Sequence, residues 1–270
     1  MRAIIVAAGR GRRLGPETAE IPKCMVPVGG RPIFHRQLDA LAFAGVEEVV
    51  VVRGYLGTRI APPPPDRPGA RLRLVFVENP QWAENNILAS LFYAESFMKD
   101  GFLFSYSDIV FARDHARRAA ASTADVGLVI DRRWEETYVG RLHHPLPEAE
   151  LAAVSTEGSV SRVVQVGKGA VPAEQAAGEF IGLARFSPTG AEALRAVWRD
   201  ATAKGLDQAY GRAPALRVAY LTDALNAVIA RAPHLPSADV EPIFIDGSWR
   251  EIDTEEDLAR AQDVVDAWDA

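Results

Sequence analysis

Small and basic residues gather in a loop directly after the first apolar segment of the chain. Ala3–Ala7 is an apolar run of strand length, and it leads into Ala8-Gly9-Arg10-Gly11-Arg12-Arg13. Glycines lack a Cβ atom, so the backbone N–H groups of such a loop can approach an anion closely. The arginines of the loop, with Lys23 shortly beyond it, add enough positive charge for a triphosphate. The pattern therefore predicts nucleotide chemistry.

Two common phosphate-binding loops do not fit this segment. A dinucleotide-binding fingerprint has a third glycine where this chain has Leu14, and it opens directly into a helix. Here Pro16 and Pro22 keep the segment from continuing as a helix. A Walker A loop has Gly-Lys followed by Ser or Thr, whereas Lys23 follows Pro22 and precedes Cys24. Both motifs are excluded.

Two acidic segments that are far apart in the sequence offer ligands for a metal ion. Asp108 follows the apolar run Phe102–Phe104, where a strand of a parallel sheet should reach the active-site edge. Mg²⁺ prefers one or two carboxylates together with phosphate oxygens. Asp108 could instead cap a helix that begins near Ala112, and its own context leaves both roles open.

The second acidic segment runs from Asp246 to Asp257 and follows an expected strand at Val240–Ile245. Thr254 and Asp257 form an acidic variant of the capping box, which predicts a helix that begins at Thr254. Asp253 would then lie on the turn before the helix, free to face a ligand. Glu251, two residues earlier, is the auxiliary candidate.

The elements that must position these residues alternate between strands and helices. This alternation implies a mostly parallel sheet with helices on both faces and an active site beyond the carboxyl ends of the strands. From the β-branched runs and the helical periodicity, we expect strands at Glu48–Arg53, Arg71–Glu78, Phe102–Phe104 and Val126–Ile130, and helices at Arg31–Ala44 and Asn85–Met98.

The first loop matches a known pattern position by position. The pattern is G-x-G-x-R-L-x-P-x-T-x-x-x-P-K, and it falls on Gly9, Gly11, Arg13, Leu14, Pro16, Thr18, Pro22 and Lys23. This loop resembles that of the nucleotidyltransferases that join an NTP to a phosphorylated small molecule and release pyrophosphate. Glu78-Asn79-Pro80 and Asn85-Asn86-x-x-x-Ser90-Leu91 resemble the phosphocholine cytidylyltransferase branch of that family.

The resemblance extends from Ala3 to about Leu258 and implies both a fold and site residues. The fold is α/β, with a three-layer, Rossmann-like, mixed and mostly parallel sheet of the nucleotide-diphospho-sugar transferase type. Arg13 and Lys23 would bind the triphosphate and stabilise the charge that develops during transfer, and Asp108 and Asp253 would hold Mg²⁺. The nucleotide-binding set is Ala7, Ala8, Gly9, Gly11, Arg12, Arg13, Glu78, Asn85, Asn86 and Ser90.

The Asn-Asn segment is expected to contact the nucleotide base. Asn86 and Ser90 are one turn apart on the expected helix, so their side chains can face one way and meet a pyrimidine edge. Either Asn85 or Asn86 is also expected to cap this helix.

The sequence leaves the acceptor open. A quaternary ammonium such as choline prefers an aromatic cage, and Glu179 or Asp131 could pair with an ammonium group. The same positions would serve an aminoalkylphosphonate or a polyol phosphate. His143 and His144 are expected in a turn or a substrate loop. The acceptor-binding candidates are Trp134, Tyr138, Glu179, Trp249 and Glu251.

Composition agrees with a soluble enzyme. The chain has 270 residues and a net charge of −6, with both signs interspersed, which gives no footprint for nucleic acid. Its longest apolar runs are of strand length, so no membrane span or hydrophobic leader is expected. The single cysteine, Cys24, excludes an internal disulfide and fits the reducing cytoplasm. The expected partners are an NTP, with CTP favoured, and a phosphorylated small molecule; a homodimer is left open.

The chain is expected to form one nucleotidyltransferase domain over residues 1–270. Residues 1–133 would be the NTP-binding half, about 134–220 the acceptor-binding segment, and 221–270 the metal-binding turn and closing helix.

The leading hypothesis is a Mg²⁺-dependent cytidylyltransferase. A sugar-1-phosphate nucleotidyltransferase using UTP, dTTP or GTP is the second hypothesis, and the Asn-Asn…Ser-Leu segment argues against it by resemblance. A non-catalytic nucleotide-binding regulator is the third. The set of Arg13, Lys23, Asp108 and Asp253 argues against a regulator, because a pure binder has no need of it.

Overall fold

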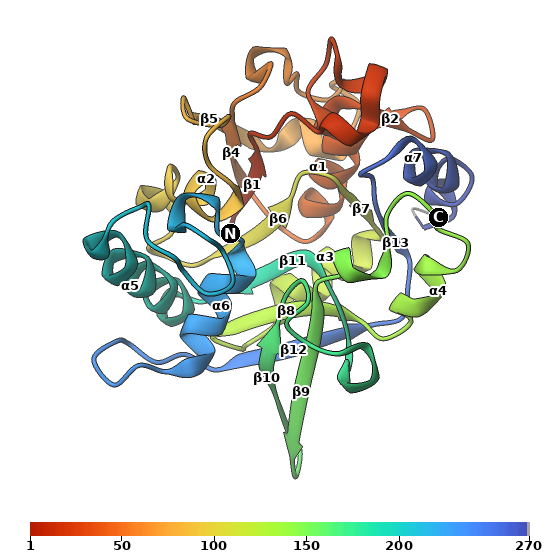
Figure 1. Cartoon of the computed structure of the whole chain (residues 1–270). Coiled ribbons are helices and arrows are strands. Elements are labelled where there is room, and N and C mark those ends of the chain that lie inside the picture. Colours follow the sequence, from red (N-terminus) through yellow and green to blue (C-terminus); the bar gives the residue numbers. More distant parts are fainter. Residues whose placement is uncertain (269–270) are drawn as a thin grey trace.

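The computed structural model of the chain describes residues 1–268, and at its centre lies one nine-stranded sheet (Figure 1). The strands of this sheet are β1 (Arg2–Ala7), β4 (Glu48–Arg53), β5 (Arg73–Glu78), β6 (Phe102–Tyr106), β8 (Val126–Asp131), β9 (Leu151–Glu157), β10 (Val160–Val166), β11 (Gly178–Phe186) and β12 (Val240–Ile245). Their order is β10-β9-β11-β6-β1-β4-β5, and β8 joins by pairing with β11 and β12. Both halves of the chain therefore contribute to one sheet.

The sheet is mixed, with a parallel first half. Strand β1 pairs in parallel with β4 and β6, and β4 pairs in parallel with β5. The four valines Val49–Val52 of β4 have no exposed surface, as expected for a strand that is covered on both faces. Strand β11 runs antiparallel to β6, β8 and β9, whereas β12 is parallel to β8. The expected mixed sheet is confirmed.

Helices pack on both faces of the sheet and create three layers. Phe34 and Ala116, from the first and third helices, lie in a hydrophobic cluster on one face. Leu91, Leu194 and Leu225, from three other helices, lie in a separate cluster on the opposite face. The expected three-layer fold class is thus confirmed. The helices are α1 (Ile33–Phe43), α2 (Ile87–Phe92), α3 (Arg113–Ala121), α4 (Trp134–Tyr138), α5 (Pro188–Lys204), α6 (Leu221–Ala230) and α7 (Glu255–Gln262).

Two predicted helices begin later and end earlier than expected. Helix α1 begins at Ile33 because Arg31–Pro32 forms strand β3, which pairs with β2 (Pro27–Val28). Helix α2 begins at Ile87 because Asn86 has an extended backbone and caps it, and the segment ends in a separate 3-10 turn at Glu95–Phe97. The predicted strand at 71–78 begins at Arg73.

A small second sheet joins two distant parts of the chain. Strand β7 (Ile109–Phe111) pairs antiparallel with β13 (Trp249–Glu251), so that Ile109 lies opposite Glu251. The backbone N–H of Ile252 also donates to the carbonyl of Asp108 at 2.8 Å. The loops that carry Asp108 and Asp253 therefore lie side by side.

The middle of the chain adds a hairpin and a loop to this frame. The β9–β10 hairpin extends away from the body of the molecule, and α4 precedes a loop that runs back towards α7 (Figure 1). Pro62–Pro65 lies in the connection between β4 and β5, outside any helix or strand. Within residues 1–268, none of the helices combines the length and the hydrophobicity needed to cross a bilayer.

Candidate active site

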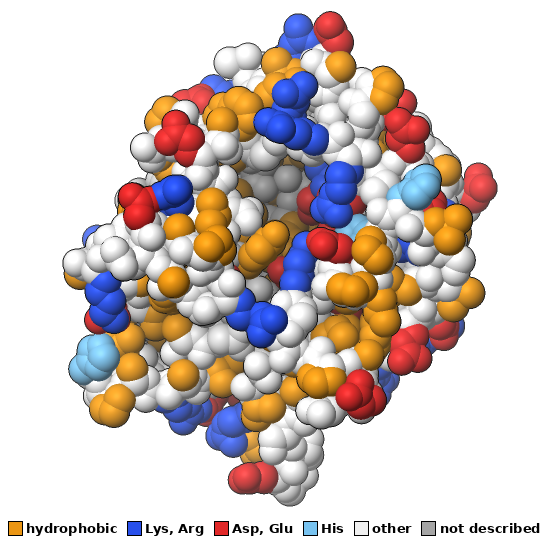
Figure 2. Space-filling model, viewed as in Figure 1, with side chains coloured by type: hydrophobic (Ala, Val, Ile, Leu, Met, Phe, Trp, Pro, Cys, Tyr) orange, Lys and Arg blue, Asp and Glu red, His pale blue; other side chains and the backbone are white. Residues whose placement is uncertain are grey.

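A cavity of about 370 Å³ opens at the carboxyl ends of β1 and β6. Figure 2 shows a hollow on this face of the molecule, with basic and acidic side chains around it. The position agrees with the rule that α/β sheets bind ligands beyond the carboxyl ends of their strands. The predicted site residues that line the cavity are Ala7, Gly9, Gly11, Arg12, Arg13, Lys23, Asn85, Asn86, Ser90, Asp108, Glu179, Trp249, Glu251 and Asp253.

The first loop is closed by short-range contacts that bring Lys23 next to its glycines. Gly11 has a φ of +67°, and a Cβ atom added there would lie 2.9 Å from Cδ of Lys23. The hydroxyl of Thr18 donates to the carbonyl of Gly11 at 3.1 Å. Gly11 is therefore required both by its backbone conformation and by the close approach of Lys23.

Lys23 joins the two predicted metal ligands. Its Nζ donates to Oδ2 of Asp108 at 2.7 Å and also contacts Asp253, which in turn pairs with Arg13. Burial alone would lower the pKa of Lys23, but Asp108 and Asp253 outweigh it and raise that pKa, so the ammonium stays charged. Burial would raise the pKa of Asp253, yet Lys23 and Arg13 bring it below its usual range. Four predicted residues thus form one charge cluster, in which Lys23 and Asp253 are buried, Asp108 is partly exposed and Arg13 is exposed.

Asp253 is held on its turn by the capping box that the sequence predicts. The hydroxyl of Thr254 accepts from the N–H of Asp257 at 3.1 Å. The carboxylate of Asp257 accepts from the N–H groups of Asp253 and Thr254, at 3.1 and 2.9 Å. The other open role for Asp108, as a helix cap, is wrong: α3 is preceded by Ala112, without a side-chain cap, and Asp108 instead contacts Lys23.

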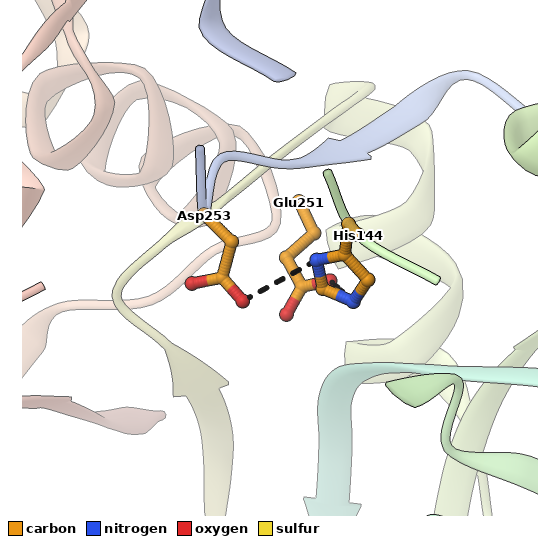
Figure 3. Close-up of side chains that lie close together, drawn as sticks. All are labelled: His144, Glu251 and Asp253. Carbon is orange, nitrogen blue, oxygen red and sulfur yellow. Dashed lines mark ion pairs between the residues drawn. The ribbon is translucent and has the colours of Figure 1, made fainter. Parts of the chain in front are cut away.

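His144 completes a group of side chains that could hold a metal ion (Figure 3). It has no exposed surface, and its Nε2 and Nδ1 lie 3.4 Å from Glu251 and 3.6 Å from Asp253. Burial, with help from Arg141, lowers the pKa of His144 to about 4, so the imidazole is neutral at pH 7. A neutral imidazole and two carboxylates are donors that suit a divalent cation.

The sequence did not point to His144 as a site residue. The loop position expected for His143 and His144 is confirmed, but only His144 turns inward, whereas the His143 side chain is 73 % exposed. His144 and Asp253 are more than one hundred positions apart, so no local spacing could have joined them. The path of the loop brings the two residues together, and this path cannot be read from the periodicity of the sequence.

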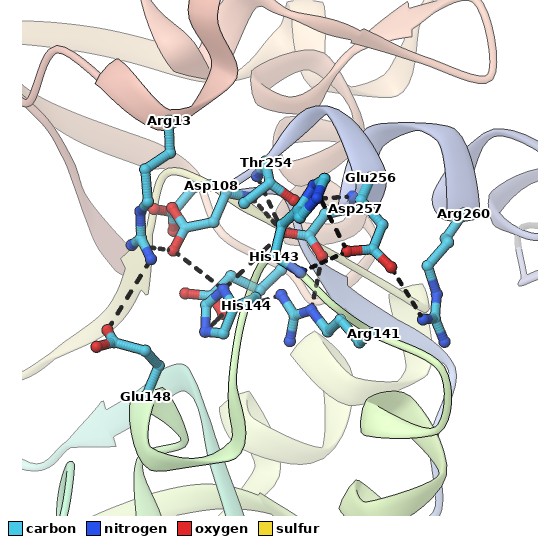
Figure 4. Close-up of polar contacts among 12 residues, drawn as sticks. Arg13, Asp108, Arg141, His143, His144, Glu148, Thr254, Glu256, Asp257 and Arg260 are labelled. Atoms are coloured by element: carbon cyan, nitrogen blue, oxygen red, sulfur yellow. Dashed lines mark hydrogen bonds and ion pairs between the residues drawn. The ribbon is translucent and has the colours of Figure 1, made fainter.

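A buried ion pair fixes this loop against α7 (Figure 4). Nε of Arg141 donates to Oδ1 of Asp257 at 2.6 Å, and the guanidinium lies 3.6 Å from Glu251. The N–H groups of Leu142 and His143 donate to the carboxylate of Glu256. Arg141 is a second residue that sequence reasoning missed as part of the site.

The three predicted side chains of the Asn-Asn segment, Asn85, Asn86 and Ser90, all line the cavity. Asn86 caps α2, since its side chain accepts from the N–H of Ile87 at 2.8 Å, and this confirms the expected cap. Asn86 lies just before the helix, and its side chain caps the helix rather than pairing with Ser90. Ser90 donates instead to Asn85 at 3.1 Å, and the buried Asn79 donates to both, so Asn79 joins this polar wall.

Two predicted nucleotide-binding residues do not line the cavity. Glu78 pairs with Arg53 at 2.6 Å and is largely exposed. Ala8 is buried, and its carbonyl accepts from the N–H of Tyr55 at 3.0 Å. Ala8 lies between the lining residues Ala7 and Gly9 without lining the cavity itself.

The aromatic acceptor residues lie mostly behind the cavity. Trp134 and Tyr138 pack with Leu151 and Val171 in a small hydrophobic cluster, and neither lines the cavity. The aromatic cage expected from this pair is therefore wrong.

Trp249 does line the cavity. Its indole N–H donates to Asp131 at 2.8 Å, which also corrects the expectation that Asp131 could pair with an ammonium group.

Further lining residues had not been predicted. The hydroxyl of Tyr106 donates to Glu150 at 3.0 Å, and Lys168 donates to Glu148 at 3.1 Å. Burial raises the pKa of Glu150 to about 7 and that of Glu179 to about 8. Cys24 also lines the cavity, but burial raises the pKa of its thiol to about 12, which makes it unreactive at neutral pH.

Comparison with known proteins places this geometry in a family. The chain is 29 % identical to the CTP:phosphoglutamine cytidylyltransferase of Campylobacter jejuni, over 96 % of this chain and 98 % of that enzyme. The structure of CTP:phosphocholine cytidylyltransferase from Streptococcus pneumoniae matches with a TM-score of 0.70 and 21 % identity, over 98 % of each chain. A UDP-glucose pyrophosphorylase with bound UDP-glucose matches with a TM-score of 0.74 and 14 % identity, again over 98 % of each chain.

These two structural matches show that the fold is shared. Residues 3–176 match the MobA-like NTP transferase domain, and they include the first loop, the Asn-Asn segment and Asp108. The chain therefore belongs to the family of MobA-like NTP transferase domains and is a nucleotidyltransferase.

Proposed function

We propose that this protein transfers a cytidylyl group from CTP to a phosphorylated or phosphonate small molecule and releases pyrophosphate, with Mg²⁺. The observation that carries the proposal is the charge cluster of Arg13, Lys23, Asp108 and Asp253 at one end of the cavity. The choice of CTP is supported by the likeness to a cytidylyltransferase over nearly the whole of both chains.

The reaction needs positioning and charge neutralisation more than acid–base chemistry. An oxygen of the acceptor phosphate attacks the α-phosphorus of CTP, and the bond from that phosphorus to the bridging oxygen of pyrophosphate breaks. The attacking oxygen already carries negative charge, so no general base is required. Arg13 and Lys23 are fixed cations that would bind the triphosphate and stabilise the departing pyrophosphate.

The donor set of the site fits a divalent cation. Asp108 and Asp253 offer carboxylate oxygens beside the cavity, and the buried His144 has two ring nitrogens without a hydrogen-bond partner. Asp108 and Asp253 would hold Mg²⁺, which when bound neutralises phosphate charge. Lys23 contacts both carboxylates and, with Arg13, holds the pKa of Asp253 below its usual range.

The middle segment, about residues 134–220, would supply the acceptor subsite. Its contribution to the cavity wall supports this role, because the wall at that end is formed by Glu148, Glu150, Lys168, Glu179 and Tyr220. Glu148 also lies 3.9 Å from Arg13, so the segment meets the first loop across the opening (Figure 4).

Pyrophosphate release tests the proposal. CTP, UTP, dTTP, GTP and ATP would each be incubated with Mg²⁺ and with phosphoethanolamine, phosphocholine, 2-aminoethylphosphonate, inositol phosphate or glucose 1-phosphate. Release that requires CTP and a non-sugar acceptor supports the proposal. Release only with a sugar phosphate and another NTP makes the chain a sugar nucleotidyltransferase. Nucleotide binding without release in any pair contradicts catalysis on these acceptors and favours a regulator.

A further inference from the structure

Two buried carboxylates at the acceptor end of the cavity each keep one oxygen without a hydrogen-bond donor. Glu150 and Glu179 both line the cavity and are 5 % and 3 % exposed. Oε1 of Glu150 and Oε2 of Glu179 have no partner among the described residues. Buried polar atoms in native proteins are normally paired, so such atoms in a cavity wall indicate where a ligand group belongs.

The second oxygen of each carboxylate is held by a phenol. Tyr106 donates to Oε2 of Glu150 at 3.0 Å, and Tyr138 donates to Oε1 of Glu179 at 2.7 Å. Each phenol fixes one oxygen of its carboxyl group and leaves the other, which is itself buried, without a donor. Such preorganised acceptors suit a ligand that brings N–H or O–H donors.

The nearest lysine does not satisfy these oxygens. Nζ of Lys168 donates to Glu148 at 3.1 Å and lies 5.2 Å from the centre of the Tyr220 ring. It therefore engages Tyr220 through a cation–π contact, and the ring face that could receive a quaternary ammonium already faces a cation.

Both signs of charge line the cavity. The first loop and Lys23 contribute cations, whereas the middle segment contributes three glutamates (Glu148, Glu150 and Glu179) against one cation, Lys168. An acceptor that carries an anionic phosphate at one end and a cation at the other matches this distribution.

We propose that Glu150 and Glu179 bind an N–H-bearing ammonium group of the acceptor. This inference rests on the proposed function and names its substrate class: amino-bearing phosphates or phosphonates, including phosphorylated amino acids. A trimethylammonium group has no N–H and cannot satisfy the two free oxygens. A bound ammonium group favours the ionised form of the two carboxyl groups, which burial disfavours in its absence, whereas an uncharged polyol does not.

A methylation series tests the inference directly. Pyrophosphate release with CTP would be measured for phosphoethanolamine, its mono-, di- and trimethylated forms, and ethyl phosphate, which lacks the amine. We expect kcat/KM to fall by at least about tenfold when the last N–H is lost, and to be lower again for ethyl phosphate. Equal or better use of the trimethylated form or of ethyl phosphate would overturn the inference.

Two isosteric variants assign the effect to the named residues. Glu150→Gln and Glu179→Gln keep an oxygen to accept from the phenol, but they replace the free oxygen with an amide NH2 and cannot become negatively charged. We expect each to raise KM for phosphoethanolamine by about tenfold while KM for CTP stays unchanged. Glu174→Gln, an exposed glutamate of the same segment, is the matched control and should change neither constant. Unchanged discrimination between phosphoethanolamine and ethyl phosphate in both variants would overturn the assignment.

A binding measurement separates this inference from the proposed function. If no pair of nucleotide and acceptor releases pyrophosphate, the proposed function fails. Calorimetric titration of the protein with phosphoethanolamine and with ethyl phosphate then tests the subsite alone. Tighter binding of phosphoethanolamine that is lost in Glu150→Gln and Glu179→Gln supports the inference, and equal binding of the two compounds overturns it.

Discussion

Lys23 lies between two carboxylates, and its ammonium group connects the first loop to the acidic turn near residue 253. The cluster joins two cations, Arg13 and Lys23, to the carboxylates of Asp108 and Asp253. Such a mixture of charges suits a site where a polyanion and a metal cation meet. Asp108 and Asp253 alone would repel each other, and the ammonium group of Lys23 offsets that repulsion. In the proposed function, the same ammonium group also binds the triphosphate.

Replacing Lys23 should affect catalysis more than stability. In Lys23→Met we expect kcat to fall by about 10²–10³-fold, because a fixed cation is lost where charge develops. The free energy of unfolding should change by less than about 2 kcal/mol, since Asp253 keeps Arg13 as a partner and Asp108 is partly exposed.

Steady-state kinetics and urea-induced unfolding check this prediction. Lys99→Met, which changes an exposed lysine, is the control and should match the unchanged protein in both assays. Retained kcat in Lys23→Met would remove Lys23 from the chemistry.

Glu179 should make stability depend on pH. Burial raises its pKa to about 8 from the ordinary value of 4.5, although Tyr138 and Arg141 act in the opposite direction. The folded protein thus holds a proton that the unfolded chain releases above about pH 4.5, so this group's contribution is full at low pH and is lost as pH rises towards 8. Glu150 and Asp131 are the other carboxylates that act on it, and both raise its pKa.

In Glu179→Gln this decline should be reduced by an amount on the order of a few kcal/mol between pH 5 and pH 8. Urea unfolding at several pH values measures it. Glu150, with a pKa of about 7, leaves a smaller residual slope. An unreduced slope in Glu179→Gln would show that this carboxyl is not protonated in the folded state.

At the scale of elements, the first loop depends on one glycine. Gly11→Ala should lower kcat/KM by about tenfold or more, because a methyl group there meets the side chain of Lys23 at 2.9 Å and displaces it. The left-handed backbone adds strain of about 1–2 kcal/mol.

Gly158→Ala separates the two effects. Gly158 has a φ of +61° with nothing within 4 Å of its added Cβ atom, so it carries the backbone strain without the clash. We expect similar destabilisation in both variants, measured by thermal unfolding, but full activity only in Gly158→Ala. Equal activity in the two would contradict the role assigned to the Gly11–Lys23 contact.

The loop after α4 depends on the Arg141–Asp257 pair. Arg141→Met should destabilise the protein by about 3 kcal/mol, since a buried carboxylate loses its partner. Activity should fall as well, because this loop brings Glu148 and Glu150 to the cavity and His144 to Asp253. Urea unfolding measures the first effect and pyrophosphate release the second.

Arg133→Met is the matched control. Arg133 pairs with Glu136 on the surface of the same segment, where both side chains are more than half exposed. Surface pairs of this kind contribute little, so we expect no measurable change. If both variants behave alike, the buried pair does not anchor the loop.

At the scale of the whole molecule, nucleotide and metal should stabilise the fold together. A ligand present at one hundred times its dissociation constant adds about 2.7 kcal/mol, which raises the Tm of a chain of this size by roughly 5–10 °C. We expect this rise with CTP and Mg²⁺ and its loss when EDTA removes the metal. A full rise in EDTA would show that Asp108 and Asp253 do not need a cation to accept the triphosphate.

Sequence patterns were sufficient to predict the central sheet of the molecule and the part of the site that is formed by the first loop and the acidic turn. The valine run of β4, the loop from Gly9 to Lys23 and the capping box at Thr254 are local signals, and each lies where it was expected. The cap expected at Asn85 or Asn86 is Asn86, and both Asn86 and Ser90 line the cavity. His144, Arg141 and Glu150 could not be recognised, because a loop without periodicity brings them to partners far away in sequence.

The pairing of β7 with β13 also bears on the order in which the molecule can become competent during synthesis. Ile109 pairs with Glu251, which lies 142 positions later in the chain (251 minus 109). Contacts of such long sequence separation form late, since a large loop must close first. A nascent chain that has emerged as far as β12 contains the loop from Gly9 to Lys23 and the Asn-Asn segment but not Asp253. With the metal-binding role proposed for Asp253, nucleotidyl transfer requires that nearly all of the polypeptide has left the ribosome.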